Sequence, residues 1–475
     1  MDPRILHHEW AILETVSPPT GSPGPAVEIA GAGPAADYAR RLLGDLGLAV
    51  AFAPGPPDPH PALAWARSGA MALTGHADGL PRVPDGPLAS CAAGAGRALR
   101  ALGAAAPADA AALLGARAAA AGLGRRGRTS PGGSCRLLRA ADGWGALNLA
   151  RPEDAAALPA WLETAAPPDA DPWDFAARAL PARRLDAWVQ RAAWLGLPFA
   201  ACERPAPGPW LRLFTRGRDA PPPARPPRVL DLSSLWAGPL CGALLAASGA
   251  EVWKVESAAR PDGARSGPPA FFEALNAGKR SVQLDFARDA DRARLAALVD
   301  GADVVIEASR PRALAQLGID AQRFVEARPG RIWLCLTGYG RDDAPPGRIA
   351  FGDDAAVAAG CALAVADAVG PLFCGDALAD PLAGLHAAVA VQAAWRCGQG
   401  IGLDLSLRDV CAFALGFATV DDFEVEGTAA AAQVCAEGPG GGAAAVEAPR
   451  LEPVAARVRA GKAMDEPGAA EAAPC

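Results

Sequence analysis

The stretch that decides the fold runs from Arg228 to Glu256 and reads RVLDLSSLWAGPLCGALLAASGAEVWKVE. Residues 228–232 and 251–255 are short apolar runs with the length and the Val and Leu content of buried strands. Between them, residues 239–248 are small and apolar and end at Gly249, a typical helix terminator. A strand, a helix and a strand in this order predict a β-α-β unit with parallel strands.

The same alternation continues downstream. Residues 281–285, 303–307 and 331–337 read as strands, and residues 289–299 and 381–395 read as helices. This order predicts an α/β protein with a Rossmann-like, mostly parallel sheet and flanking helices. Ligands of such sheets bind at the carboxyl ends of the strands.

The N-terminal half repeats part of this pattern. Residues 27–30, 38–46 and 48–52 resemble the first strand, helix and strand of the later unit, and Ser90 falls where the later copy has Asp380. We interpret residues 26–110 as a partial, degenerate copy of the later domain. Chance similarity between two segments rich in Ala and Gly remains an alternative.

Pro-rich joints suggest the domain boundaries, and the best of them is APPPARPP at residues 220–227. Before it, a strand at 135–138, a turn at Asp142-Gly143 and a strand at 146–149 predict a small α+β domain. The resulting division is an N-terminal tail (1–25), the partial copy (26–110), the small α+β domain (111–219), the linker (220–227), the large domain (228–415) and a partly flexible C-terminal segment (416–475).

Composition excludes several function classes. Among 475 residues, 45 Lys and Arg face 52 Asp and Glu, which leaves a net charge of −7 and argues against nucleic-acid binding. Apolar stretches are interrupted by charges and Pro, so no membrane helix is expected. The N-terminus lacks the basic and apolar regions of a signal peptide, and the 11 Cys show no paired spacing. We therefore expect a cytoplasmic protein without a metal site or a tightly bound cofactor.

One candidate chemistry is dinucleotide binding. Residues 31–36 read GAGPAA and match the pattern G-x-G-x-x-A, but the following strand ends at residues 51–54 without the acid that would bind a ribose hydroxyl. In the later unit Glu256 supplies such an acid, yet the turn at residues 237–242 lacks the glycine pattern. A nicotinamide-dependent oxidoreductase is therefore the least supported alternative.

A series of motifs in the large domain points elsewhere. In chain order they are VLDL (229–232), AGP (237–239), GAEV (249–252), KVE (254–256), N-x-GKRSV-x-LD (276–285), ADVVIE (302–307), LG (317–318) and GYG (338–340). Over about residues 228–410 this series closely resembles the family III CoA-transferases, also called the CaiB/BaiF family. The small α+β domain resembles that family more loosely.

The resemblance implies a catalytic aspartate in the pattern D-x-x-x-G-x-H, which here is Asp380 followed by Gly384 and His386. Because Asp380 precedes Pro381, we expect its carboxylate at a helix N-cap, where the helix dipole favours the anion. Asp376 is the nearest rival, but it lacks the following Gly and His. The alternatives are that Asp380 is only a helix cap and that His386 only packs on its helix.

The resemblance also implies CoA contacts. The matching positions, including Arg310 as a substitute phosphate contact, are Leu235, Trp236, Ala237, Lys279, Leu284, Asp285, Arg310 and Asp353. Several basic residues of the family pattern are absent, because Ser257, Ala287 and Gln316 stand in their places. Arg260, Arg288 and Arg312 are further candidates to pair with a phosphate.

The predicted function is therefore CoA transfer from an acyl-CoA thioester to a small carboxylic acid. A non-catalytic CoA-binding scaffold protein is one alternative. An acyl-CoA racemase of the same fold is another, but residues 350–354 read AFGDD and lack its histidine. Family members form interlocked dimers, so we expect either a homodimer or a monomer whose two halves mimic one.

Overall fold

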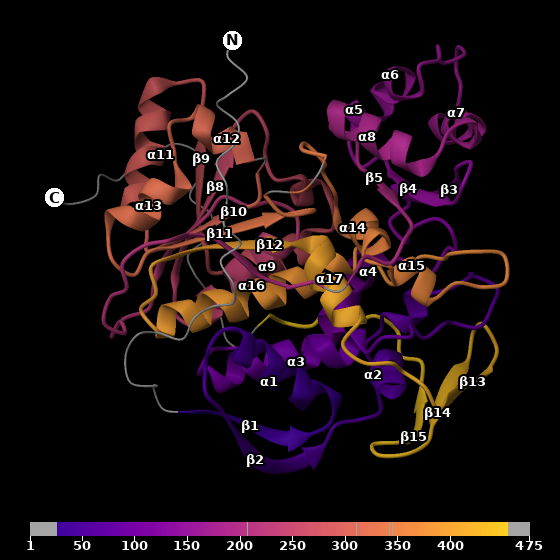
Figure 1. Ribbon diagram of the computed structural model, residues 1–475, viewed down its shortest axis with the longest axis horizontal. Coiled ribbons are helices and arrows are strands. Elements are labelled where there is room, and N and C mark those ends of the chain that lie inside the picture. The colour runs from indigo at the N-terminus through magenta and orange to yellow at the C-terminus, as the bar shows by residue number, and fades with distance from the viewer. Residues whose placement is uncertain (1–25, 207, 310, 342, 344, 455–475) are drawn as a thin grey trace.

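A seven-stranded sheet forms the centre of the second half of the chain in the computed structural model, which describes residues 26–206, 208–309, 311–341, 343 and 345–454 (Figure 1). The strand order is β6-β12-β11-β10-β7-β8-β9, and all neighbours are parallel except β6 and β12 at one edge. The strands are β6 (Arg212–Arg216), β7 (Arg228–Asp231), β8 (Glu251–Ser257), β9 (Arg280–Leu284), β10 (Val304–Glu307), β11 (Ile332–Thr337) and β12 (Ile401–Ser406). The predicted α/β fold with a mostly parallel sheet is confirmed.

The strands of this sheet are apolar along their length because helices cover both faces. On β11, Trp333 and Cys335 join the core beneath α11 (Asp289–Gly301) and α13 (Ala321–Ala327), whereas Ile332 and Leu334 join the core on the opposite face. That opposite face carries α9 (Ala237–Ala247) and α16 (Ala379–Arg396), which are apolar nearly all round and almost wholly buried. The other helices of this half are α10 (Pro269–Asn276), α12 (Pro311–Gln316), α14 (Gly352–Ala358), α15 (Cys361–Ala364) and α17 (Leu407–Leu415), with the 3₁₀ turn η5 (Gly263–Ser266).

The first half packs beneath α9 and α16 as further layers (Figure 1). It has its own parallel pair, β1 (Val27–Ala32) and β2 (Val50–Pro57), which does not join the large sheet. In β1 every second residue is buried, as expected for a strand with one covered face. The helices are α1 (Pro34–Asp45), α2 (Pro61–Arg67), η2 (Met71–Leu73), α3 (Leu88–Ala101), η3 (Ala110–Gly115) and α4 (Ala116–Ala121).

The small α+β domain has a three-stranded antiparallel sheet, β3 (Cys135–Arg139), β4 (Trp144–Asn148) and β5 (Phe199–Ala201). Residues 140–143, with the predicted Asp142-Gly143, join β3 to β4. Trp161, Trp188 and Phe199 form the centre of its core. Its helices are α5 (Pro152–Ala156), α6 (Leu158–Leu162), α7 (Pro172–Ala179), η4 (Leu180–Ala182) and α8 (Leu185–Leu195). The last strand of the predicted 111–219 domain, β6, instead pairs with β12 of the large sheet.

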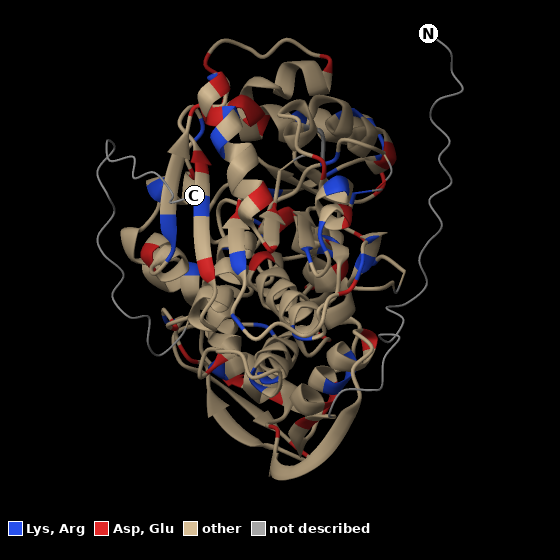
Figure 2. Cartoon of the chain, turned by 90° about the vertical axis from the view of Figure 1, so that its left-hand side faces the viewer, with Lys and Arg blue, Asp and Glu red and all other residues tan. Residues whose placement is uncertain are grey.

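The described part of the C-terminal segment is an antiparallel sheet of β13 (Phe423–Gly427), β14 (Ala432–Ala436) and β15 (Gly442–Ala445), which packs on α2. The predicted tail at 1–25 lies outside the described residues. Figure 2 shows acidic and basic residues interspersed over the face it views. Within the described ranges, no helix has both the length and the apolar character needed to cross a membrane.

Candidate functional site

Two helices bring the candidate site together. Gly384 of α16 faces the start of α9, where a Cβ built on it would lie 2.7 Å from the Ala237 carbonyl oxygen. Glycine has no Cβ, so α16 can approach the turn after β7 closely at this position. A residue with a Cβ in place of Gly384 would push the two segments apart. The first turn of α16 therefore lies beside residues 235–237, the predicted CoA-binding turn.

Asp380 lies in the first turn of α16, but it is not the N-cap. The helix begins at Ala379 with Leu378 as N-cap residue, so the predicted position of Asp380 at the cap is wrong. Pro381 lies further inside this first turn, where its missing N–H still breaks no helical hydrogen bond. The carboxylate of Asp380 lies against Gly352 of α14, and a Cβ built on Gly352 would collide with it.

Backbone conformation is unusual at both sides of this junction. Leu235 has a φ of 70° and Ala377 has a φ of 43°, in the left-handed region that residues with a Cβ rarely adopt. Leu235 donates its backbone N–H to Asp262, and Ala377 donates its own to Asp353, each at or below 2.9 Å. Such conformations concentrate at functional sites, where surrounding contacts hold them in place.

Four aspartates gather at this junction, and Arg117 faces three of them, Asp353, Asp376 and Asp380. Asp376 accepts hydrogen bonds from Nε and Nη2 of Arg117 at 2.8 and 2.5 Å, and Asp353 lies 3.8 Å from the same Nη2. Asp354 accepts a hydrogen bond of 2.8 Å from Asn148. Asp353, Asp354 and Asp376 are buried, whereas Asp380 is only partly buried. Within the described residues, no hydrogen bond or ion pair holds the Asp380 carboxylate.

The pKa values of three of these carboxyl groups are raised, mainly because burial disfavours the charged form. Burial raises the pKa of Asp380 to about 7; Arg117 opposes this rise, and the neighbouring aspartates add to it. Burial raises the pKa of Asp354 to about 7 and that of Asp353 to about 6. Asp380 therefore titrates near neutral pH. The sequence had suggested instead that the helix dipole would keep this carboxylate ionised.

The predicted CoA-binding turn is partly open. Leu235 is 38% exposed, and Trp236 is buried edge-on against Phe271 with ring centres 5.0 Å apart. Trp236 also lies 6.0 Å from the guanidinium of Arg117, which links the turn to the aspartate cluster. Asp353, the predicted acid near the thioester, lies in the same cluster through its contacts with Arg117 and Ala377.

The ammonium group of Lys279 is bound by other groups of the protein. Its ammonium group is buried and lies 2.8 Å from both Asp231 and the carbonyl oxygen of Pro239. Lys254 is buried in the same way, 2.8 Å from Asp262. A buried lysine needs such a partner to stay charged, so both lysines stabilise the ends of β7 and β8 instead of facing solvent.

Leu284 and Asp285 lie at and just after the end of β9, the edge strand of the large sheet. Leu284 is buried at the end of β9, and Asp285 uses its carboxylate to accept the backbone N–H of Ala287. Neither Arg310 nor the side chain of Arg312 is part of the described structure. The roles of these residues toward CoA stay predictions.

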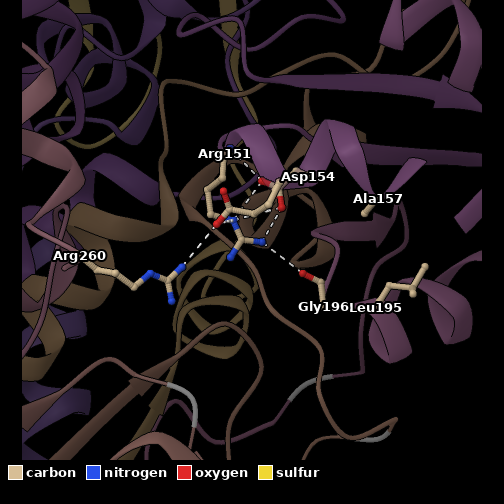
Figure 3. Close-up of a pocket in the computed structure, with 7 residues that line it drawn as sticks. Arg151, Asp154, Ala157, Leu195, Gly196 and Arg260 are labelled. Atoms are coloured by element: carbon tan, nitrogen blue, oxygen red, sulfur yellow. Dashed lines mark hydrogen bonds and ion pairs between the residues drawn. The ribbon is translucent and has the colours of Figure 1, made fainter. Parts of the chain in front are cut away.

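A cavity of about 230 Å³ lies where the small α+β domain meets the loop after β8 (Figure 3). Arg260 from that loop lies 3.4 Å from Glu153, and Arg151 is held by Asp154 and the Gly196 carbonyl oxygen. Arg260 is one of the arginines predicted to replace missing phosphate contacts. Both guanidinium groups are paired with carboxylates of the same lining, so the charged side chains of this cavity balance.

The glycine turn of the first half is closed by protein groups. Asp58 accepts a hydrogen bond of 2.8 Å from the Ala36 N–H at the start of α1 and another of 2.6 Å from Arg97. A Cβ on Gly33 would lie 2.9 Å from the Asp58 Cβ. The helix N-terminus that would bind a phosphate therefore already holds a carboxylate, which argues further against dinucleotide binding here.

His386 packs between the two halves. It is fully buried, with Nδ1 donating to the Leu382 carbonyl oxygen and Nε2 accepting from the Tyr38 hydroxyl, each at 2.7 Å. Burial lowers its pKa to about 4, so the imidazole is neutral. These contacts favour the packing interpretation of His386.

Sequence reasoning missed Arg117, Asn148 and Asp354. Arg117 and Asn148 come from the first half and the small α+β domain, and both reach the site only through tertiary packing. Asp354 follows Asp353 directly, and the doubled acid in a buried helix was the one signal available.

Comparison with known proteins identifies the second half. Residues 227–441 match the sequence model of CoA-transferase family III. An acyl-CoA transferase of Fusarium pseudograminearum is 34% identical over 38% of this chain and 44% of its own length. A succinate–glutarate CoA-transferase of Agrobacterium fabrum is 32% identical over 40% of this chain and 52% of its own.

A crystal structure of a CaiB/BaiF family protein from Brucella suis matches with a TM-score of 0.38 and 31% identity over 42% of this chain and 56% of its own. The chain spans about half the length of the curated relatives it matches. Together with the ordered motifs, these sequence matches lead to one conclusion: residues 227–441 of this chain are similar in sequence to CoA-transferase family III.

Proposed function

We propose that this protein transfers CoA from an acyl-CoA thioester to a carboxylic acid, with Asp380 as the nucleophile. The observation that carries the proposal is the state of the Asp380 carboxylate. It is the one member of the aspartate cluster that is partly exposed and that no described residue binds, and it lies beside the predicted CoA turn. Asp376, the rival nucleophile, is fully buried and accepts hydrogen bonds from Nε and Nη2 of Arg117.

The proposed chemistry is a relay of acyl transfers. A carboxylate oxygen of Asp380 attacks the thioester carbonyl, the C–S bond breaks, and a mixed anhydride and CoA thiolate result. The thiolate attacks the aspartyl carbonyl, which releases the first acid and leaves an aspartyl-CoA thioester. The acceptor carboxylate then attacks this thioester, and the returning thiolate takes the new acyl group from the anhydride. Each step conserves electrons, so the relay needs no redox partner.

The raised pKa of Asp380 bears on this role in two ways. A carboxyl group with a pKa of about 7 is largely protonated below neutrality, so acylation should need neutral or alkaline pH. A more basic carboxylate is also a stronger nucleophile once it is ionised.

The acyl group and the acceptor are open. Relatives are named for succinyl-CoA with glutarate, mesaconate or D-citramalate, and for formyl-CoA with oxalate. We propose an acyl-CoA and a small carboxylic acid as the substrate classes, with these pairs as the first to test.

The test is to incubate the protein with these acyl-CoAs, add hydroxylamine, and search tryptic peptides by mass spectrometry for a hydroxamate at Asp380. Asp380→Asn should abolish both the hydroxamate and CoA exchange. Ser90→Ala, at the matching position of the other helix, should retain both. Exchange at the normal rate in Asp380→Asn would refute the proposal.

One observation favours the scaffold alternative. Lys279 is buried, and Ser257 and Ala287 replace basic residues of the family pattern, so the phosphates of CoA find fewer cations here. If CoA binds but no acyl-CoA yields exchange or a hydroxamate, the CoA-binding scaffold is the correct function.

A further inference from the structure

The aspartate cluster of the second half obtains its cation from the first half. Arg117 lies on α4, which precedes the first strand of the small α+β domain, β3, whereas Asp353, Asp354, Asp376 and Asp380 all follow β11. The bidentate ion pair between Arg117 and Asp376 thus joins residues 259 positions apart. α4 packs against η3 and α10, and its Arg117 reaches Asp353 of α14 at 3.8 Å.

The charges at this junction do not balance. Three carboxyl groups, those of Asp376, Asp353 and Asp380, face one guanidinium, and Asp354 adds a further acid beside Asp380, so they cannot all be ionised in a largely buried site. Burial alone would lower the pKa of Arg117, but Asp376, Asp353 and Asp380 together raise it, so Arg117 keeps its charge at any working pH. Asp376 takes the hydrogen bonds of Arg117, and Asp380 feels only its field.

The charged groups that face Asp380 come from three elements. Asp353 and Asp354 come from α14, Asp376 comes from the loop before α16, and Arg117 comes from α4. The three aspartates disfavour ionisation of Asp380, and Arg117 alone among these groups favours it. Removing Arg117 should therefore raise the pKa of Asp380, because the other three groups all raise it as well.

We propose that Arg117 is a positioning residue for the reaction of Asp380: its charge favours the ionised form of that carboxylate, and its bidentate ion pair with Asp376 fixes the loop that precedes α16. The first half, which has Ser90 in place of a nucleophile, thus serves as the activating half for the second. This inference rests on the proposed function of Asp380.

The first experiment is the pH profile of Asp380 acylation, measured by quenched hydroxamate formation in a single turnover. Arg117→Gln should move the acid limb upward by about one to two pH units. At pH 6 the rate should fall by about tenfold or more, and at pH 9 it should approach the wild-type rate. Arg117→Lys keeps the positive charge but loses the bidentate guanidinium geometry. Its pH profile should lie close to that of the wild type.

Two further variants separate charge from folding. Asp376→Asn removes a competing carboxylate and should move the acid limb downward. The double variant R117Q/D376N leaves no buried unpaired carboxylate from the broken ion pair, and its limb should lie between those of wild type and Arg117→Gln. A merely structural role of Arg117 would lower the rate equally at every pH, and Arg117→Lys would not restore it.

A second readout needs no acyl-CoA. Carbodiimide with glycinamide labels protonated carboxyl groups, and fragment mass spectra distinguish Asp380 from Asp376 on one peptide. The labelling midpoint of Asp380 should rise in Arg117→Gln by the same amount as the acid limb. If no acyl-CoA is turned over and the midpoint still shifts, the proposed function fails and the electrostatic role of Arg117 stands. If transfer occurs and neither the limb nor the midpoint moves, the role of Arg117 is overturned.

Discussion

In both halves of the chain, a glycine allows two helices to pack closely. The halves differ in whether the turn beside these helices is open to solvent. In the first half Gly94 of α3 packs on the Ala35 carbonyl oxygen of α1, and in the second half Gly384 of α16 packs on that of Ala237 in α9. Each glycine lies four residues after the matching Ser90 or Asp380. A Cβ would lie 2.6 Å from the carbonyl oxygen in the first case and 2.7 Å in the second.

The chemistry around these matching helices is opposite. Ser90 is 2% exposed, and the turn before α1 is filled by Asp58 and Arg97. Asp380 is partly exposed, and the turn before α9 carries the exposed Leu235. The same architecture can thus be closed by internal ion pairs or kept open for a ligand. The following predictions test this contrast.

The largest expected effect is on catalysis. Asp380→Asn should lower CoA exchange by about a thousandfold or more, since the amide cannot act as the nucleophile. Ser90→Asp in that variant should not restore exchange, because the new carboxylate would be buried away from the open turn. Exchange assays on the single and double variants check this; rescue by Ser90→Asp would show that the two halves are chemically equivalent.

The second effect is on the closed turn. Arg97→Met leaves the buried Asp58 without its ion-pair partner, which should lower the free energy of unfolding by about 3 kcal/mol. Urea unfolding at pH 7 measures this loss. Asp58→Asn in the same background should recover part of it, and no recovery would mean that Arg97 stabilises the turn by packing instead of charge.

The third effect is a pH dependence in the second half. The folded pKa of Asp354, about 7, lies above its unfolded value of about 4. Its stability contribution is therefore full at low pH and is lost as pH rises toward 7. Asp354→Asn keeps the oxygen that accepts hydrogen bonds from Asn148 and from the Phe351 N–H. Its NH₂ group replaces Oδ2, which has no hydrogen-bond partner in the described structure.

This variant should be more stable than wild type at pH 8 by about 3 kcal/mol, and the difference should vanish near pH 4. Urea unfolding at both pH values gives the comparison. A constant difference at the two pH values would show that the effect of the substitution is not one of charge.

The smallest effect concerns the shared glycines. Alanine usually stabilises a helix interior relative to glycine by about 1 kcal/mol, but Gly94→Ala and Gly384→Ala should each destabilise by about 1 to 3 kcal/mol because of the close carbonyl oxygen. Gly44→Ala in α1, with no neighbour within 4 Å, is the matched control and should not destabilise. Of the two, only Gly384→Ala should also slow acylation of Asp380.

The sequence predicted the large sheet well. The strands expected at 281–285, 303–307 and 331–337 lie within one residue of β9, β10 and β11. Continuous apolar runs bounded by turn residues identify buried parallel strands, because both faces of such a strand are covered. The exception in the small α+β domain is β6, whose partner β12 lies nearly 200 residues away.

The candidate site was predicted only in part. The motif pattern identified Asp380 and Asp353, which share one cluster in the structure. It placed Asp380 at a helix cap, which is wrong because the helix begins at Ala379, one residue before Asp380, and it did not indicate that Lys279 pairs with Asp231. The first residue of a helix can also differ by one or two positions from the one that the sequence suggests.

The sequence by itself indicated most strands and helices of the large sheet, the similarity of residues 227–441 to CoA-transferase family III, and the candidate nucleophile, since each depends on residues close together in the chain. Only the tertiary structure decided which charges surround Asp380, because Arg117 and Asn148 reach it from distant segments. Electrostatic interactions in a buried site depend on distance and solvent exclusion, and neither quantity can be read from sequence separation.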